Sequence, residues 1–157
     1  VNPPLRTQED VLALREGLAD GTIDAVATDH APHPVEDKEC EWSAAAFGML
    51  GLETAFSVVV ESMVNTGLLD WVGVADRMSR RPAQIGRVKG QGGSIAAGEP
   101  AHLTLVDPAA TWTVRPAELA SLSRNTPYRE RVLPGRVVHT IYAGNPTVTD
   151  GTAERTR

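Results

Sequence analysis

The first half of the chain alternates between helix-like and strand-like patterns of apolar residues. Three apolar residues at helical spacing lie between Thr7, which predicts an N-cap, and Gly21, which suits the position just after a helix. An apolar run at residues 23–28 follows at once and predicts a buried strand. A helix that leads directly into a strand is typical of α/β folds with parallel sheets.

Further helices are predicted downstream. Apolar residues from Leu52 to Met63 recur at spacings of three and four, and Gly67 would close the helix that they form. Asp70 is a suitable cap for a shorter helix. Pro82 fits the start of another helical turn, where its missing N–H is not needed.

The pattern becomes β-rich near residue 90. Residues 101–106 and 111–114 predict short strands separated by an Asp-Pro pair, and residues 135–142 predict another strand. The polar tail at residues 147–157 is predicted to fray. We therefore expect an α/β part before residue 90 and a mostly β part after it.

Composition narrows the function classes. The formal charge of −5 argues against nucleic-acid binding, and no apolar run is long enough to span a membrane. The single cysteine, Cys40, fits a reducing compartment and predicts a cytoplasmic location. Because the chain opens at Val1 and not at a methionine, we expect it to be part of a longer polypeptide.

The strongest chemical signal is the sequence Thr-Asp-His-Ala-Pro-His at residues 28–33. Carboxylates and imidazoles are costly to bury unless they are paired or bind a metal. At the carboxyl end of a parallel strand, such side chains face the pocket where ligands bind. These residues alone are equally compatible with a capping aspartate and two loop histidines.

Four segments together resemble the C-terminal part of class I dihydroorotases, which are cyclic amidases of the amidohydrolase superfamily. They are residues 1–6 (Val-Asn-Pro-Pro-Leu-Arg), 24–33, 47–54 and 123–128. The Asp-His-Ala-Pro-His motif is typical of cyclic amidases in general, and the Asn-Pro-Pro-Leu-Arg segment narrows the resemblance to dihydroorotases. The resemblance extends over nearly the whole chain.

This resemblance implies a fold and an activity. Residues 1–89 would be the C-terminal part of a (β/α)₈ TIM-type barrel, and residues 90–157 a segment of a small, mostly β composite domain with a C-terminal tail. The family interconverts N-carbamoyl-L-aspartate and L-dihydroorotate in pyrimidine biosynthesis and depends on one or two zinc ions. The implied partners are the rest of the same polypeptide, further copies in a homo-oligomer and aspartate carbamoyltransferase.

The resemblance also assigns roles to five residues. Asp29 would touch the metal and carry the catalytic proton, while Asn2 and His33 would contact the substrate and the Phe47–Gly48 backbone would close over it. The chemistry agrees, because a carboxylate beside a metal-activated water can move its proton and Asn2 offers both a donor and an acceptor. A histidine suits an acidic substrate. His30 stays outside the catalytic set.

The other metal ligands of the family, which include a His-x-His pair, have no counterpart among the four histidines of this chain. A catalytic zinc ordinarily needs three protein ligands, so we expect the chain alone to be inactive. Two alternatives remain open. One is another cyclic amidase, such as an allantoinase or hydantoinase, and the other is a non-catalytic dihydroorotase-like subunit that supports aspartate carbamoyltransferase.

Overall fold

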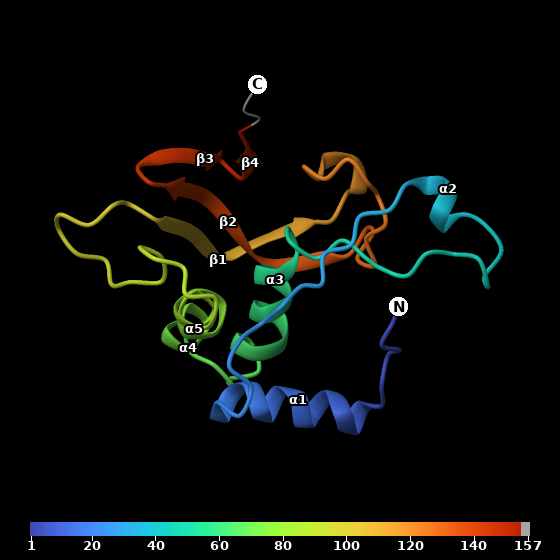
Figure 1. The fold of residues 1–157 in the computed structure, drawn as a ribbon, viewed down its shortest axis with the longest axis horizontal. Coiled ribbons are helices and arrows are strands. Elements are labelled where there is room, and N and C mark those ends of the chain that lie inside the picture. Colours follow the sequence, from blue (N-terminus) through green and yellow to red (C-terminus); the bar gives the residue numbers. More distant parts are fainter. Residues whose placement is uncertain (155–157) are drawn as a thin grey trace.

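The computed structural model describes residues 1–154, with helices in the first half and one antiparallel sheet in the second (Figure 1). The helices are α1 (Gln8–Asp20), α2 (Val35–Lys38), α3 (Ala55–Val59), α4 (Trp71–Ala75) and α5 (Arg81–Ile85). The strands are β1 (Leu103–Thr113), β2 (Val132–Tyr142), β3 (Asn145–Thr149) and β4 (Thr152–Ala153), paired in that order. Over residues 1–154, no helix combines the length and the apolar character needed to cross a membrane. The domain boundary near residue 90 stays a prediction.

Helix α1 begins and ends where its capping residues predict. The Thr7 hydroxyl accepts the Asp10 N–H (3.4 Å), and the Asp10 carboxylate accepts the Thr7 N–H (3.1 Å). The Thr7 hydroxyl also donates to the Asp10 carboxylate (2.8 Å), and this bond, followed by that from the Thr7 N–H, lowers the pKa of the Asp10 carboxyl. Gly21 has a φ of 93° and donates its N–H to the Gly17 carbonyl oxygen (3.2 Å). The apolar face of α1 is open, since Leu14 is 58% exposed.

Two longer helical stretches, at residues 55–64 and 71–85, each contain a turn of π-helix. Helix α3 runs on into Val60–Val64, and α4 continues through Asp76–Arg80 into α5. Asp70 caps α4 by accepting the Gly73 N–H (2.7 Å), and Pro82 lies in the first turn of α5. Both of these predictions are confirmed.

The predicted strand at residues 23–28 is wrong. This segment joins no sheet, because no strand of the described chain lies alongside it to form a ladder. The Val26 N–H instead bonds the Arg77 carbonyl oxygen (3.1 Å), in the π-helical turn between α4 and α5. The only β-type pairing nearby, within residues 1–154, is one parallel bridge between His30 and Met49.

Strand β1 merges the two short strands that were predicted at residues 101–106 and 111–114. It pairs with β2 from Leu103 to Thr113, with an irregular register between Asp107 and Thr111 that absorbs the proline. The predicted strand at 135–142 lies within β2. The prediction of a frayed tail is wrong for β3 and β4, which pair as a hairpin, while residues 155–157 lie outside the described residues.

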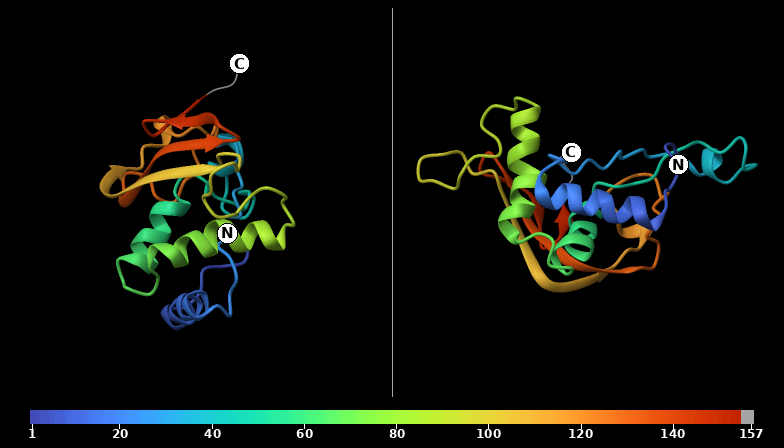
Figure 2. Two further views of the ribbon diagram at one scale, coloured as in Figure 1. Left: turned by 90° about the vertical axis from the view of Figure 1, so that its left-hand side faces the viewer. Right: turned by 90° about the horizontal axis from the view of Figure 1, so that it is seen from below.

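Helix α3 packs directly against the sheet. Figure 2 shows the sheet, then α3 with α4 and α5, then α1 as successive tiers. The buried Ser57 hydroxyl donates to the Gly135 carbonyl oxygen on β2 (2.8 Å) and accepts the Trp112 indole N–H from β1 (2.9 Å). This bond pair fixes the start of α3, and with it the loop that leads into α3.

Candidate functional site

A cavity of about 450 Å³ lies between the N-terminal segment, the loop that follows α1, and α3. Its wall contains four of the five predicted site residues: Asn2, Asp29, Phe47 and Gly48. Tyr128, from the segment after β1, completes another part of the wall. Segments far apart in sequence therefore meet at one concave surface, as the motif predicts for a ligand site.

Asp29 is the carboxylate of this cavity wall among the described residues. Its backbone is left-handed, with a φ of 45°, a conformation that aspartate and asparagine adopt more readily than most residues. The next residue holds this turn in place, because the His30 Nδ1 atom accepts the Gly51 N–H (3.1 Å) and the Leu52 N–H (3.3 Å). His30 thus acts as an acceptor that ties the Asp29 turn to the chain entering α3.

His33 lies beside the cavity, outside the wall that the described residues form. Its ring is close to Gly48, since a Cβ atom added to Gly48 would lie 2.9 Å from the His33 Nε2 atom. The His33 backbone N–H donates to the Asn125 side-chain oxygen (3.3 Å). The structure therefore brings His33 next to the predicted site without making it part of the cavity surface.

Gly48 sits in a crowded and unusual conformation. Its φ is 126°, and an added Cβ would lie 2.5 Å from the Ala31 Cβ, so a side chain here would strain the backbone and collide. The Lys38 ammonium group donates to the Gly48 carbonyl oxygen (3.1 Å) and to the Ala46 carbonyl oxygen (2.7 Å). Between them, Phe47 is 65% exposed at the mouth of the cavity.

Sequence reasoning missed Asn125. Its side-chain amide donates to the carbonyl oxygens of Ala31 (2.9 Å) and Gly48 (3.2 Å), and its own carbonyl oxygen accepts the Leu50 N–H (3.2 Å). The only signal in the sequence is that Asn125 lies inside the motif at residues 123–128. Nothing local to that motif indicates which residues it would reach.

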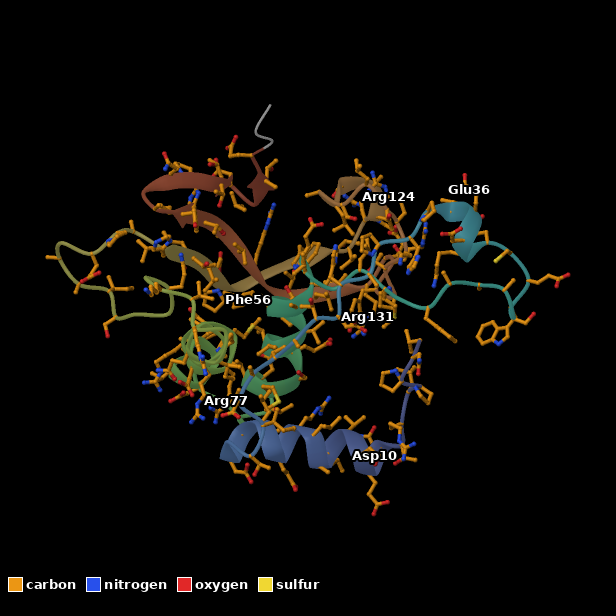
Figure 3. The ribbon with its side chains drawn as sticks, in the orientation of Figure 1. Asp10, Glu36, Phe56, Arg77, Arg124 and Arg131 are labelled. Carbon is orange, nitrogen blue, oxygen red and sulfur yellow. The ribbon has the colours of Figure 1, made fainter. Side chains whose placement is uncertain are left out.

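A network of charged side chains around Asp76 joins the helices beside the site. Asp76 binds Arg80 (2.5 Å) and Arg81 (3.1 Å), and the hydrogen bond from Arg80, followed by that from Arg81, holds the pKa of Asp76 below its ordinary value. Arg77, seen in Figure 3 where α1 approaches α4, bonds Asp76 (2.6 Å) and the Leu18 carbonyl oxygen (2.9 Å). The network therefore joins α1 to the helix whose Arg77 carbonyl oxygen receives the segment leading to the cavity.

The chemistry of the wall fits part of a metal site. Asp29 offers the oxygen ligands that zinc accepts. Over residues 1–154, no three His, Cys, Asp or Glu side chains come together in a way that could hold a metal ion. Among the described residues, Asp29 is the carboxylate that this wall offers to a metal ion.

No family model matches the chain. Individual proteins do match it. This chain is 69% identical over 151 residues to a dihydroorotase of Streptomyces coelicolor and 56% identical over 151 residues to one of Mycobacterium tuberculosis. Each match covers 96% of this chain and 35% of the relative. Over nearly its whole length, this chain is similar in sequence to dihydroorotases.

Solved structures of a related family share the fold. An L-hydantoinase (dihydropyrimidinase) of Arthrobacter aurescens aligns over 99% of this chain and 35% of its own, with a TM-score of 0.88 and 31% identity. A D-hydantoinase of a Thermus species aligns over the same shares with a TM-score of 0.87 and 27% identity. The chain spans about a third of the length of the curated dihydroorotases it matches.

Proposed function

We propose that this chain supplies the Asp29 side of a dihydroorotase active site, which interconverts N-carbamoyl-L-aspartate and L-dihydroorotate. The observation that carries the proposal is the cavity wall in which Asp29, Asn2 and Gly48 occur together. Identity of 69% to a dihydroorotase supports the same reaction. The reaction is hydrolysis of a cyclic amide in one direction and ring closure in the other.

The proposed architecture is the carboxyl-terminal portion of a (β/α)₈ barrel at residues 1–89, joined to a β-rich segment at residues 90–157. The likeness to two hydantoinase structures over nearly the whole chain supports it. In a barrel, residues 23–28 would gain strand neighbours that the described residues lack. Asp29 would then stand at the carboxyl end of a strand, where barrel enzymes hold their catalytic groups.

Asp29 is the proposed proton carrier. In ring opening, its carboxylate accepts the proton of the water that attacks the amide carbon and then delivers that proton to the departing nitrogen. The tie between His30 and the chain entering α3 holds the Asp29 turn, which suits a group that must stay within hydrogen-bond reach of the reacting atoms.

The substrate contacts are proposed for the groups around it. The Asn2 amide offers a donor and an acceptor to the ureido or imide edge of the substrate, and His33 donates to a substrate carboxylate. The Phe47–Gly48 backbone covers the bound ring from the mouth of the cavity. The close approach of Gly48 to Ala31 supports this role, because it keeps that backbone against the Asp29 loop.

Zinc is the proposed cofactor, with Asp29 as one ligand. A bound zinc ion would polarise the amide carbonyl and lower the pKa of a coordinated water to ~7. The remaining ligands would come from residues beyond those described. The rest of a longer polypeptide, a homo-oligomer and aspartate carbamoyltransferase are the proposed macromolecular partners.

A hydantoinase is the second candidate, and the fold likeness at 31% identity favours it over an allantoinase or a non-catalytic subunit. A chimera separates these functions: this chain replaces the matching 151 residues of the Streptomyces coelicolor dihydroorotase. The zinc content, kcat and KM are measured with dihydroorotate, hydantoin and allantoin. We expect turnover of dihydroorotate within about tenfold of the parent enzyme. Preference for hydantoin, or a folded chimera without any turnover, would contradict the proposal.

A further inference from the structure

Asn125 lies outside the cavity wall and binds two loops of the site, one that contains Ala31 and His33 and one that contains Gly48. Its side chain reaches across 94 positions of sequence to the Ala31 carbonyl oxygen and across 77 positions to the Gly48 carbonyl oxygen. Its side-chain oxygen accepts the His33 N–H. One amide therefore uses both of its N–H donors and its oxygen to join the two loops.

The direction of these bonds determines which part of the site Asn125 controls. Its three side-chain bonds end on Ala31, His33 and Gly48, the backbone around the proposed substrate contacts. The Asp29 turn has a separate anchor, because His30 binds the chain entering α3. Loss of Asn125 would therefore move the substrate-contacting backbone more than the proton carrier.

The Gly48 carbonyl group is held by a second side chain besides Asn125. Its carbonyl oxygen accepts from Asn125 and from Lys38, two donors that come from opposite directions along the chain. A carbonyl oxygen held by two donors has little freedom to rotate its peptide plane. The orientation of the Gly48–Met49 peptide, next to Phe47 at the cavity mouth, is thus fixed by side chains that themselves lie outside the wall.

We propose that Asn125 is a positioning residue for substrate binding, which sets the Gly48 peptide and the His33 loop at the spacing that the substrate requires. This inference rests on the proposed dihydroorotase function. It makes the segment at residues 123–128, in the β-rich half of the chain, a determinant of substrate affinity. The positioning acts through backbone carbonyl groups, and Asn125 itself touches no reacting atom.

Two substitutions in the chimera test the side-chain bonds of Asn125. Asn125→Asp keeps the oxygen that accepts the His33 N–H but places an anionic oxygen beside two carbonyl oxygens. Asn125→Ala removes all three side-chain bonds. We expect both variants to raise KM for dihydroorotate at least about tenfold while kcat stays within about threefold, because a small misplacement of binding groups costs much affinity. Asn145→Asp is the matched control, since Asn145 bonds the Ala143 carbonyl oxygen in a distant hairpin and should leave KM unchanged.

Hydrogen exchange provides a readout that needs no turnover. The Ala31 N–H donates to the Met49 carbonyl oxygen (2.9 Å), a bond that crosses between the two loops. In both Asn125 variants, the amides of Ala31, His33 and residues 48–50 should exchange faster than in the unsubstituted chimera, while α1 amides should not change. An unsubstituted chimera without activity would defeat the proposed function, and the exchange result would still test the positioning. Unchanged KM in both variants, or unchanged local exchange, would overturn the inference.

Discussion

Gly48 lies so close to Ala31 that a Cβ atom on Gly48 would be only 2.5 Å from the Ala31 Cβ. This approach brings the loop before α3 against the loop that carries Asp29, and it depends on the absence of a side chain. The mouth of the cavity is therefore set by a contact that no other residue type permits at this position.

Gly48→Ala should lower both the stability of the chimera and its catalytic efficiency. The backbone at a φ of 126° adds strain of about 1–3 kcal/mol, and the collision with Ala31 adds to it. We also expect kcat/KM to fall at least about tenfold, since reacting groups must be held closely. Denaturant unfolding and steady-state kinetics measure the two effects.

Gly67→Ala is the matched control. Gly67 also has a positive φ, 75°, but an added Cβ would meet nothing within 4 Å. The Gly67→Ala variant should lose only the ~1–2 kcal/mol of stability that a left-handed backbone costs a residue with a side chain. Its kcat/KM should stay that of the unsubstituted chimera. Equal effects of the two substitutions on kcat/KM would show that the approach of Gly48 to Ala31 has no role in the site.

His33→Ala should weaken substrate binding and leave the metal in place. A charged hydrogen bond to the substrate in a closed site would account for about 1.5–3 kcal/mol, which is a loss of roughly 10–150-fold in kcat/KM. The expected change lies mainly in KM, with zinc content near that of the unsubstituted chimera. A variant stripped of zinc would instead make His33 a metal ligand.

Acid should weaken the Asp76 network in a defined range. Because hydrogen bonds from Arg80 and Arg81 lower the folded-state pKa of Asp76, its contribution to stability is complete above the unfolded-state value of ~4 and is lost as the pH falls through the lower folded value. Asp76→Asn should therefore be less stable than the unsubstituted chimera at pH 7. The difference should shrink below pH ~4.

Urea midpoints at pH 7, 4 and 3 would measure this effect. Asp37→Asn, at an exposed position in α2, is the control and should give midpoints parallel to those of the unsubstituted chimera. A difference between Asp76→Asn and the unsubstituted chimera that stays constant down to pH 3 would mean that the arginine contacts do not depend on the ionised carboxylate.

Local chemistry was readable from the sequence. Thr7 and Gly21 mark the ends of α1, and Asp70 marks the start of α4, because a capping side chain serves backbone groups within a few residues of itself. Four of the five predicted site residues line one cavity. These residues could be predicted for a different reason, because their motifs resemble those of a known family. Their catalytic and binding roles stay predictions.

Long-range pairing was not readable. Asn125 reaches Ala31 across 94 positions, and no pattern within the motif at residues 123–128 indicates that partner. The strand expected at residues 23–28 failed because a strand requires a neighbour, which apolar periodicity cannot supply. The irregularity between Asp107 and Thr111 likewise lets β1 continue past a proline that predicted its end.

The central claim is that Asp29 carries the proton of a dihydroorotase reaction, and Asp29→Asn in the chimera tests it most directly. Asparagine tolerates the left-handed backbone at this position at least as well as aspartate, so the turn should keep its shape while losing the group that accepts a proton. The measurement is kcat in both directions with zinc content determined alongside. We predict that a zinc-replete variant falls ~10²–10⁴-fold in each direction. A zinc-replete variant that keeps more than about a tenth of the unsubstituted rate, well short of that range, would contradict the account, because another group would then move the proton.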